Sequence, residues 1–410
     1  MIRIRHKRDC CGCGSCVQIC PKQCIRMVED RDGVPYPFVD TSACVDCGLC
    51  EKVCPIINVR PTTLPEDILT YAAINRREDV RLSSSSGGVF QAFAEYTINS
   101  GGVVFGATFD RNWEVVHDKA CALDEIEPLK RSKYVQSDTR NTFAEAKDLL
   151  LQGKCVTYVG TPCQIAGLKQ FLRKDYDNLI TISVICHGVP SRGVWRKYLT
   201  EIKSERSEAF GKNTVLPSLK FIPEITGINF REKQNGGYVW QKFGFVVKHK
   251  SPFEGDQNSV LWSSYVWEEP YMLSFLRDYI SRPSCFDCKF RNGSSHSDII
   301  IGDFWGIEKV CEKGDFTSDK GTTWILATNQ KGADFVNGIE IIKRQFSLKE
   351  GRWANTALIR NPRRPLSHHI YLILCRRYSV AKTLAITEKF YSVEQGTMNI
   401  LRKIKKLLNV

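Results

Sequence analysis

The sequence lacks any long hydrophobic run. Its longest apolar stretches, such as LITISVIC and IYLILC, are far shorter than the roughly 18 residues that a membrane-spanning helix needs. It has no low-complexity segment, and its first nine residues, MIRIRHKRD, are charged and lead directly into cysteines. We therefore expect no transmembrane helix and no signal peptide, and we expect a cytoplasmic protein.

Cysteine, in contrast, is abundant. The chain has 18 cysteines among 410 residues, and ten of them lie within the first 54. Because the cytoplasm keeps thiols reduced, disulfides are a poor explanation, and the uneven distribution indicates metal binding. With 42% apolar residues and 10% aromatics, the chain can form a sizeable core in two or three domains.

Two runs of four cysteines share the spacing C-x2-C-x2-C-x3-C-P. Pro21 closes the first run and Pro55 closes the second. This doubled spacing is typical of the two [4Fe–4S] clusters of bacterial ferredoxins, and chance or zinc sites rarely match it. The fourth cysteine of each run is expected to bind the other cluster. The predicted ligand sets are Cys10, Cys13, Cys16 and Cys54 for one cluster, and Cys44, Cys47, Cys50 and Cys20 for the other.

The segment between the two runs, DRDGVPYPFVD, predicts a β-hairpin. Gly12, Gly14 and Gly48 allow the backbone to wrap closely around the sulfur atoms. We therefore predict a two-cluster ferredoxin-like domain over residues 1–60 and a proline-containing linker over residues 61–66.

The following segments alternate between strand-like and helix-like patterns. ILTYAAIN and KCVTYVG are typical of strands, whereas SGGVFQAFAEYTINS and TPCQIAGLKQFLRK have helical spacing. From about 217 to 250 the pattern changes to β, with a hairpin signal at KQNGGYVW. The predicted fold class is α+β or α/β: the ferredoxin-like domain, a mixed α/β domain in two parts (67–205 and 206–345), and a basic helical extension (346–410).

Four further cysteines form a candidate third metal site. Cys285 and Cys288 form a CxxC pair, which needs two more ligands, and Cys163 and Cys186 follow predicted strands, where α/β sheets gather ligands. A [4Fe–4S] cluster or zinc fits this set, and Cys163 and Cys186 can each also be an inert buried thiol. The cysteines predicted not to bind metal are Cys11, Cys24, Cys121, Cys155, Cys311 and Cys375.

Two turns have the composition of phosphate-binding turns. SSSSGGVF and YVGTPCQ both place hydroxyl and glycine residues before a predicted helix, where backbone N–H groups can bind phosphate oxygens. An ordinary helix cap is the alternative and the commoner outcome. Lys133 in RSKYVQS can offer its charge to a phosphate or a flavin ring, or it is a solvated surface lysine.

Seven motifs in this order resemble the coenzyme F-420 hydrogenase/dehydrogenase β-subunit family: SSSSGGVF, GGVVFGATFD, LKRSKYVQS, VGTPCQIAGLK, ICHGVPS, RPSCFDCKF and SDIIIGDFWG. With the ferredoxin-like domain, the resemblance covers residues 1 to about 310. It implies FAD and a third [4Fe–4S] cluster held by Cys163, Cys186, Cys285 and Cys288. The flavin surroundings implied by it are Ser86, Gly87, Gly88, Lys133, Tyr134, Thr161 and Pro162.

The chain also departs from the hydrogenase members of this family. Its ferredoxin-like domain is fused at the front, about 100 residues follow the last motif, and the paired CxxC motifs of a nickel site are missing. This layout resembles bacterial relatives encoded among polysaccharide-synthesis genes. The resemblance therefore implies a glycan precursor or another small molecule as substrate, and it leaves the use of F-420 open.

Together these cofactors predict an oxidoreductase that passes electrons between ferredoxin-type clusters and FAD to reduce or oxidise its substrate. His187 is a candidate proton donor or, alternatively, a hydrogen-bond partner behind the metal site. Asp303 is a candidate acid–base residue or a structural cap. An electron-transfer subunit that relays electrons to F-420 or to a separate catalytic partner is the alternative function. The expected redox partner is an external ferredoxin or a similar protein.

Positive charge is concentrated at the C-terminal end. The formal net charge is +13, and residues 353–410 contain eleven Lys/Arg and two Glu. The tail NILRKIKKLLNV places five apolar residues on one helical face. No motif that reads nucleic acid accompanies this charge, so we predict no nucleic-acid binding. Peripheral contact with an anionic membrane at its inner face, or with an acidic ferredoxin, fits better, and a docked, solvated helix is the alternative.

Overall fold

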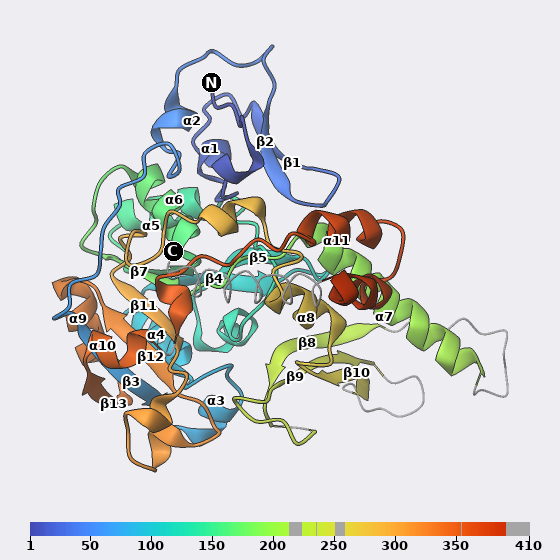
Figure 1. Cartoon of the computed structure of the whole chain (residues 1–410). Helices are drawn as coiled ribbons and strands as arrows, with labels where there is room; N and C mark the ends of the chain where they lie inside the picture. Colours follow the sequence, from blue (N-terminus) through green and yellow to red (C-terminus); the bar gives the residue numbers. More distant parts are fainter. Residues whose placement is uncertain (213–223, 235, 251–258, 354, 391–410) are drawn as a thin grey trace, which may run out of the picture.

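The computed structural model describes residues 1–212, 224–234, 236–250, 259–353 and 355–390. It has a mixed α/β architecture in which a ferredoxin-type domain lies over an eight-stranded sheet (Figure 1). Among these described residues, none of the helices has the length and apolarity that crossing a membrane requires. The predicted helix of the basic tail, residues 399–410, lies outside the described residues.

The ferredoxin-type domain consists of one hairpin and two short helices. Strands β1 (Ile25–Glu29) and β2 (Pro35–Val39) pair antiparallel, which confirms the predicted hairpin. Helices α1 (Ser15–Gln18) and α2 (Leu49–Lys52) each follow a glycine in the left-handed conformation, Gly14 at φ 82° and Gly48 at φ 73°. Other residues rarely adopt this conformation, so the two glycines allow each cysteine run to turn sharply into its helix.

The central sheet has the strand order β13-β3-β12-β11-β7-β6-β4-β5. Its strands are β3 (Leu69–Asn75), β4 (Val103–Phe109), β5 (Val115–Ala120), β6 (Val156–Gly160), β7 (Leu179–Val184), β11 (Ile299–Asp303), β12 (Thr323–Ala327) and β13 (Ile341–Phe346). β4, β6, β7 and β11 are parallel, and the remaining strands join through antiparallel pairs. Strands from both predicted parts of the α/β domain share this one sheet, although the exact domain boundaries stay predictions.

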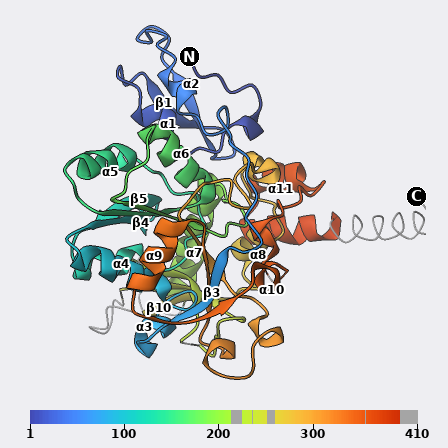
Figure 2. The same cartoon turned by 90° about the vertical axis from the view of Figure 1, so that its left-hand side faces the viewer.

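Helices cover both faces of this sheet (Figures 1 and 2). On one face, α4 (Val89–Asn99) and α9 (Gln330–Gly338) pack through Phe93 and Val336 against buried isoleucines of the strands. On the other face, α5 (Thr142–Leu151) and α6 (Pro162–Leu172) pack against β4, β6 and β7. The short helices α3 (Glu78–Leu82) and α10 (Leu348–Arg352) lie near the β3 side of the sheet.

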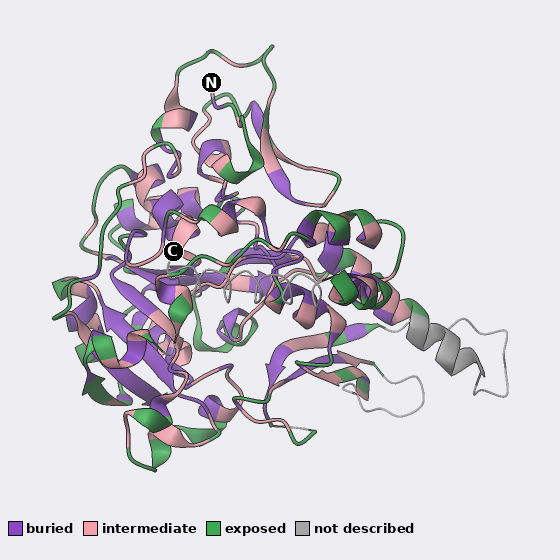
Figure 3. Ribbon diagram, viewed as in Figure 1, coloured by how far each residue is buried: buried purple, intermediate pink, exposed green. Residues whose placement is uncertain are grey.

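A second, antiparallel sheet has the order β10-β9-β8. Its strands, β8 (Ile225–Glu232), β9 (Gly244–His249) and β10 (Ser259–Tyr265), include the segment where the sequence pattern changes to β. The sheet shares a core with α7 (Arg192–Lys212), α8 (Pro270–Leu276) and α11 (His368–Cys375). Figure 3 shows this buried region beside the core of the central sheet. The structure also contains short turns of 3-10 helix: η1 (Lys7–Asp9), η2 (Leu123–Glu125), η3 (Glu127–Leu129), η4 (Pro283–Asp287), η5 (Ile307–Lys309), η6 (Asp315–Thr317) and η7 (Thr356–Leu358). Residues 380–390 are helical as well.

The carboxyl ends of β6, β7 and β11 lie at one edge of the central sheet, because these strands are parallel neighbours. Cys163 follows β6, Cys186 follows β7 and Asp303 ends β11. β3 runs in the same direction, and its last residue, Asn75, holds the turn before α4 through a bond from its N–H to the carbonyl of Gly87 (2.7 Å). The sheet topology therefore collects the predicted site residues at this edge.

Candidate iron–sulfur centres and cofactor site

The second cysteine run, together with Cys20, lines a pocket inside the ferredoxin-type domain, which we call the second-run centre. Its walls include Cys20, Cys24, Cys44, Cys47 and Cys50. Cys20 comes from the first run and therefore joins the first three cysteines of the second run. Its sulfur lies 3.4 Å from the sulfur of Cys24, a residue predicted not to be a ligand. This set of thiols has the chemistry that a [4Fe–4S] cluster needs, with one thiol to spare.

The first-run centre is formed by Cys10, Cys13, Cys16 and Cys54. Cys16 interacts electrostatically with the other three, so the structure brings the fourth cysteine of the second run to the first run. Burial raises the pKa of the Cys54 thiol to about 12. Iron binding there must therefore displace a proton. The thiols fit the crossed ligand sets, and the individual ligand assignments stay predictions.

A third group of cysteines lines a separate cavity at the edge of the central sheet where the parallel strands end. We call this cavity the pocket centre. Five cysteines line it: Cys11, Cys163, Cys186, Cys285 and Cys288. The empty space in this pocket, including the part open to solvent, is ≈ 660 Å³. The four predicted ligands thus line a single cavity, and their thiols fit a third cluster. In the described part of the chain, no three His, Cys, Asp or Glu side chains are placed to share a single metal ion.

Local hydrogen bonds orient the thiols of the pocket centre. The N–H of Val189 donates to the sulfur of Cys285 (3.4 Å), and the hydroxyl of Thr161 lies 3.2 Å from the sulfur of Cys163. Such bonds to sulfur are one of the factors that set the potential of an iron–sulfur cluster. Burial also raises the pKa of Cys285 to about 12.

Cys11 connects the pocket centre to the first-run centre. Its buried thiol packs in one cluster with Cys13, and Cys163 and Cys288 pack against that cluster. The neighbouring Cys11 thiol lowers the pKa of Cys13 to about 7. We predicted no metal role for Cys11, and its adjacency to Cys10 gave no sign of this position. The two centres are therefore neighbours that share one thiol in the wall between them.

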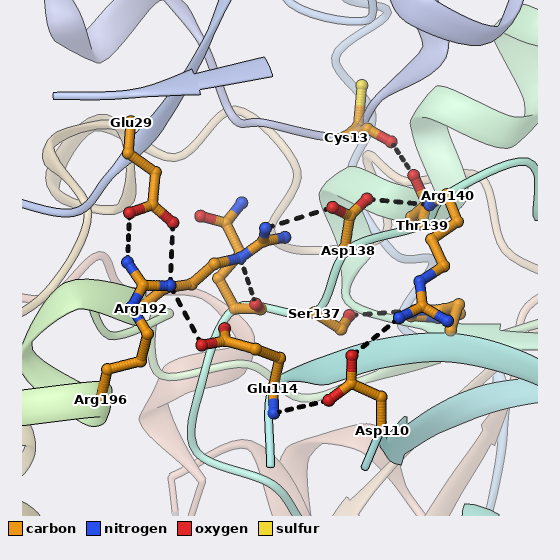
Figure 4. A network of polar contacts seen from close by, with 12 residues as sticks. Cys13, Glu29, Asp110, Glu114, Ser137, Asp138, Thr139, Arg140, Arg192 and Arg196 are labelled. Atoms are coloured by element: carbon orange, nitrogen blue, oxygen red, sulfur yellow. Dashed lines mark hydrogen bonds and ion pairs between the residues drawn. The ribbon is translucent and has the colours of Figure 1, made fainter. Parts of the chain in front are cut away.

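Polar contacts to the cysteine loop fix the ferredoxin-type domain on the sheet. The hydroxyl of Thr139 donates to the carbonyl of Cys13 (2.8 Å), as Figure 4 shows, and the amide of Gln136 donates to the carbonyl of Cys11 (2.9 Å). Gly167 of α6 permits the close approach, because a Cβ there would lie 2.8 Å from the Cβ of Cys13.

Ion pairs at the rim add a weaker contact between the same two parts. Arg196 of α7 pairs with Glu29 of β1 and with Glu114, next to β5 (Figure 4). Its side chain is 44% exposed, so solvent screens these pairs.

The serine turn before α4 is anchored to the neighbouring strand β12. The hydroxyl of Ser86 donates to the carbonyl of Thr322 (3.0 Å), and the N–H of Gly87 donates to the hydroxyl of Thr323 (3.0 Å). Gly88 adopts a left-handed conformation and caps α4. These bonds fix the turn, and they occupy two of the donors that the sequence offered for a phosphate.

The second predicted flavin segment, Lys133 and Tyr134, contacts the serine turn. The N–H of Ser132 donates to the hydroxyl of Ser85 (2.9 Å). The ammonium of Lys133 donates to the carbonyls of Pro128 (2.9 Å) and Lys130 (2.6 Å), and burial lowers its pKa to about 7. The ammonium of Lys133 thus stabilises its own loop and does not extend toward a phosphate or flavin site.

Two cations that we did not predict lie beside the predicted flavin residues, Lys233 at the serine turn and Arg231 at Tyr134. Lys233 is 6% exposed and donates to the carbonyl of Ser86 (2.7 Å), and burial lowers its pKa to about 7. Arg231 is 3% exposed, lies close to Tyr134 and pairs with Asp303. Neither residue carried a sequence signal, because charged residues at the end of strand β8 are usually solvated.

The Arg231 guanidinium supplies a test of whether a flavin fits here. Its Nε and Nη2 are buried and make no hydrogen bond of good geometry within the described residues. The guanidinium lies 4.6 Å from the ring centre of Phe243 and 5.1 Å from that of Trp305. Unsatisfied buried donors are costly, so this arrangement fits a planar ligand with carbonyl or phosphate oxygens, as FAD has.

The other two residues predicted to surround the flavin, Thr161 and Pro162, lie beside the cysteines and not at the serine turn. Pro162 lines the pocket centre, and Thr161 caps α6 through its N–H and hydroxyl, which both donate to Gln164 (3.0 Å). The structure therefore brings Ser86–Gly88 together with the loop of Lys133 and Tyr134, whereas Thr161 and Pro162 border the cysteines.

His187 lies between the pocket centre and the predicted flavin segment at Tyr134. Its Nε2 is 2.9 Å from an oxygen of Asp278. Its ring contacts Phe275 at 5.0 Å between ring centres, and Phe275 contacts Tyr134 at 5.1 Å. His187 thus follows Cys186 in the chain and reaches the predicted flavin segment through one aromatic ring.

Asp303 uses both carboxylate oxygens in hydrogen bonds. One oxygen accepts from Arg231, and the other accepts from the indole N–H of Trp240 (2.7 Å). Its backbone carbonyl accepts from Asn355 (3.0 Å). These bonds favour the structural alternative for Asp303, because both carboxylate oxygens are already engaged by neighbouring side chains.

Two models of known protein families match parts of this chain. Residues 153–350 match the family model that describes the C terminus of the beta subunit of coenzyme F420 hydrogenase/dehydrogenase, and residues 9–57 match that of a 4Fe-4S dicluster domain. The first match confirms the resemblance to this family over the range that holds the last four of the seven motifs. No curated protein matches the chain.

Thirteen chains of solved structures match as well. One belongs to the structure titled "Xenon derivatization of the F420-reducing [NiFe] hydrogenase complex from Methanosarcina barkeri". It is 15% identical in sequence, the alignment covers 81% of this chain and 93% of that chain, and the TM-score is 0.42.

Proposed function

We propose that this chain, an iron–sulfur electron-transfer protein related to the beta subunit of F420 hydrogenase, is an FAD-dependent oxidoreductase. It passes electrons between its clusters and FAD to reduce or oxidise a small molecule or glycan precursor. The observation that carries this proposal is the continuity of the sites. Cys11 packs with Cys13 of the first-run centre and lines the pocket centre. His187 follows Cys186 in the chain, and Phe275 contacts both His187 and Tyr134.

In this proposal the protein residues have distinct tasks. When bound, iron–sulfur clusters supply single electrons and a flavin exchanges them for pairs. Cys163, Cys186, Cys285 and Cys288 hold the third cluster, and Arg231 and Lys233 offer buried positive charge to the flavin. The pairing of Arg231 with Asp303 keeps the guanidinium in place, and its buried Nε and Nη2 would donate to the flavin.

His187 is the proposed proton donor for the substrate. Its Nε2 bond to Asp278 orients the ring and leaves Nδ1 for a second partner. The side chain is 37% exposed, so protons can reach it from solvent. A His187→Gln variant should keep its flavin and clusters but reduce the substrate more slowly, and equal rates would return His187 to a structural role.

The alternative is an electron-transfer subunit that delivers electrons to F-420 or to a separate catalytic protein. The match to the beta-subunit model over residues 153–350 is compatible with this alternative. An external ferredoxin is the proposed donor in both cases. Membrane contact through residues 399–410 stays a prediction, because that segment lies outside the described residues.

One experiment distinguishes these functions. The protein is purified without oxygen, its iron, sulfide, zinc and flavin are measured, and it is mixed with reduced ferredoxin, NADH or reduced F-420. FAD near one per chain that is reduced by ferredoxin and reoxidised by a small molecule supports the enzyme. Bound clusters without flavin, even after reconstitution with FAD, would contradict the proposal.

A further inference from the structure

Arg282 precedes the CxxC pair and is one of the most deeply buried charged residues of the protein, at 1% exposure. Its guanidinium donates three hydrogen bonds, each 2.8 Å long. The acceptors are the carbonyl of Cys10, the side-chain oxygen of Gln136 and the carbonyl of Pro35. Its carbon also lies 4.7 Å from the ring centre of Tyr36. All these partners are neutral.

No carboxylate of the described residues pairs with Arg282. In this it differs from Arg231, which is also buried and has Asp303 as its counter-ion. Buried charges are normally paired or located beside a metal centre, because removing a cation from water is costly. Neutral hydrogen bonds only partly compensate that cost. The position therefore calls for an anionic group near the guanidinium.

The groups nearest to Arg282 are cysteines of two centres. Its guanidinium interacts electrostatically with Cys10 of the first-run centre and with Cys11 and Cys285 at the pocket centre. Its backbone carbonyl accepts the N–H of Cys285 (2.9 Å). Gly12 makes room for it, since a Cβ at Gly12 would lie 2.7 Å from Nη1. One side chain thus lies against both sets of thiols.

We propose that Arg282 is the shared counter-charge of the first-run centre and the pocket centre. Four cysteine thiolates outweigh the charge of a cubane core, so each centre is anionic when loaded and more anionic when reduced. A buried cation between them favours the reduced forms and weakens the repulsion between two reduced centres. Arg282 is thus a positioning residue that also sets the potentials at which electrons enter the body of the protein.

This inference rests on the proposed function only for the pocket centre. The first-run centre lies in the part that matches the 4Fe-4S dicluster model. A preparation with about eight iron atoms per chain would remove the third cluster from the proposed function. The effect of Arg282 on the first-run centre would still be measurable, so the two failures are distinguishable.

The test compares Arg282→Gln, which removes the charge, with Arg282→Lys, which keeps it but loses the planar fork. The loaded full-length protein is titrated with dithionite, and the potentials are followed by electron paramagnetic resonance and visible absorbance. We expect Arg282→Gln to shift the potential of the first-run centre, and of the pocket centre, to more negative values. Arg282→Lys should remain close to the unmodified protein.

Arg196→Gln is the matched control. Arg196 also links the ferredoxin-type domain to the body, but its side chain is 44% exposed and it pairs with Glu29 and Glu114. Solvent screens such a charge, so this variant should leave the potentials unchanged.

Three outcomes would overturn the proposal. The first is an unchanged potential in Arg282→Gln with full iron content. The second is an equal shift in the Gln and Lys variants, which would mean that the geometry of the fork matters and not the charge. If Arg282→Gln does not retain iron, the Lys variant decides: retention at the normal potential supports the counter-charge, whereas loss of iron there is the third contrary outcome.

Discussion

The ferredoxin-type domain and the α/β body assemble their cysteines in different ways. In the ferredoxin-type domain, three cysteines of each centre come from one short turn, and a left-handed glycine, Gly14 or Gly48, leads into the helix that follows. In the body, Cys163, Cys186 and the CxxC pair come from three separate segments, which meet only because β6 and β7 are parallel neighbours. The first arrangement is local, and the second depends on the whole sheet.

This difference has a consequence for sensitivity to mutation. A local set of ligands keeps its geometry as long as the turn forms, whereas a dispersed set needs every connection of the sheet. The ferredoxin-type domain also has a spare thiol beside its second-run centre, Cys24, and the body has Cys11 on the wall of its pocket. The predictions below test how independent the two regions are.

The largest expected effect is loss of the pocket centre on its own. The reconstituted protein should contain about twelve iron atoms, and a Cys285→Ser/Cys288→Ser variant should contain about eight. The ferredoxin-type domain should keep its spectrum, because none of its predicted ligands is changed. Iron and zinc analysis with electron paramagnetic resonance measures this, and the exposed Cys121→Ser is the control. Loss of all iron would show that the two regions are not independent.

The next effect concerns the spare thiol of the second-run centre. Because the sulfurs of Cys20 and Cys24 are 3.4 Å apart, Cys20→Ala alone should retain part of this centre with Cys24 as the replacement ligand. The double variant Cys20→Ala/Cys24→Ala should lose it, and Cys24→Ala alone should not. In each case the first-run centre should keep its signal. Damage confined to that first-run centre would contradict the crossed ligand sets.

A smaller effect is expected at the flavin residues of the body. Arg231→Gln should weaken FAD binding by about tenfold or more, since a hydrogen bond to a charged group contributes roughly 1.5–3 kcal/mol. Flavin fluorescence during titration of the flavin-free protein measures the affinity. The exposed Arg344→Gln is the control. Equal FAD affinity in Arg231→Gln and Arg344→Gln would place the flavin elsewhere. The cluster signals should be the same in these two variants and in the unmodified protein.

The smallest effect is a dependence of flavin affinity on pH. Burial lowers the pKa of Lys233 to about 7 from an ordinary value near 10.5, so its ammonium is present below pH 7 and is lost as pH rises through 7. FAD affinity should therefore fall several-fold between pH 6 and pH 8, and Lys233→Met should remove that dependence. For the flavin-free protein the sign is opposite: stability should rise from pH 7 to about 10.5, because the unfolded chain holds the proton that the folded one has released.

The sequence by itself determined the features that depend on residues close together in the chain. The cysteine spacing, the hairpin at DRDGVPYPFVD and the alternating strands and helices were all predicted, and the structure contains the hairpin and the α/β order. The reason is that a turn of three residues, a two-fold alternation or a helical repeat is set by the residues within it. The seven motifs added the resemblance to a family, and a family model matches residues 153–350.

The tertiary structure alone decided which side chains meet. It directed the ammonium of Lys133 into its own loop, and it brought Lys233 to the serine turn and Arg231 to Tyr134 from the end of β8. It also placed Cys11 between two centres and Arg282 against both. These contacts join residues tens to hundreds of positions apart, so they depend on strand order and on the docking of the ferredoxin-type domain. No local pattern specifies either, because a charged residue at a strand end looks the same in sequence whether it faces water or a buried site.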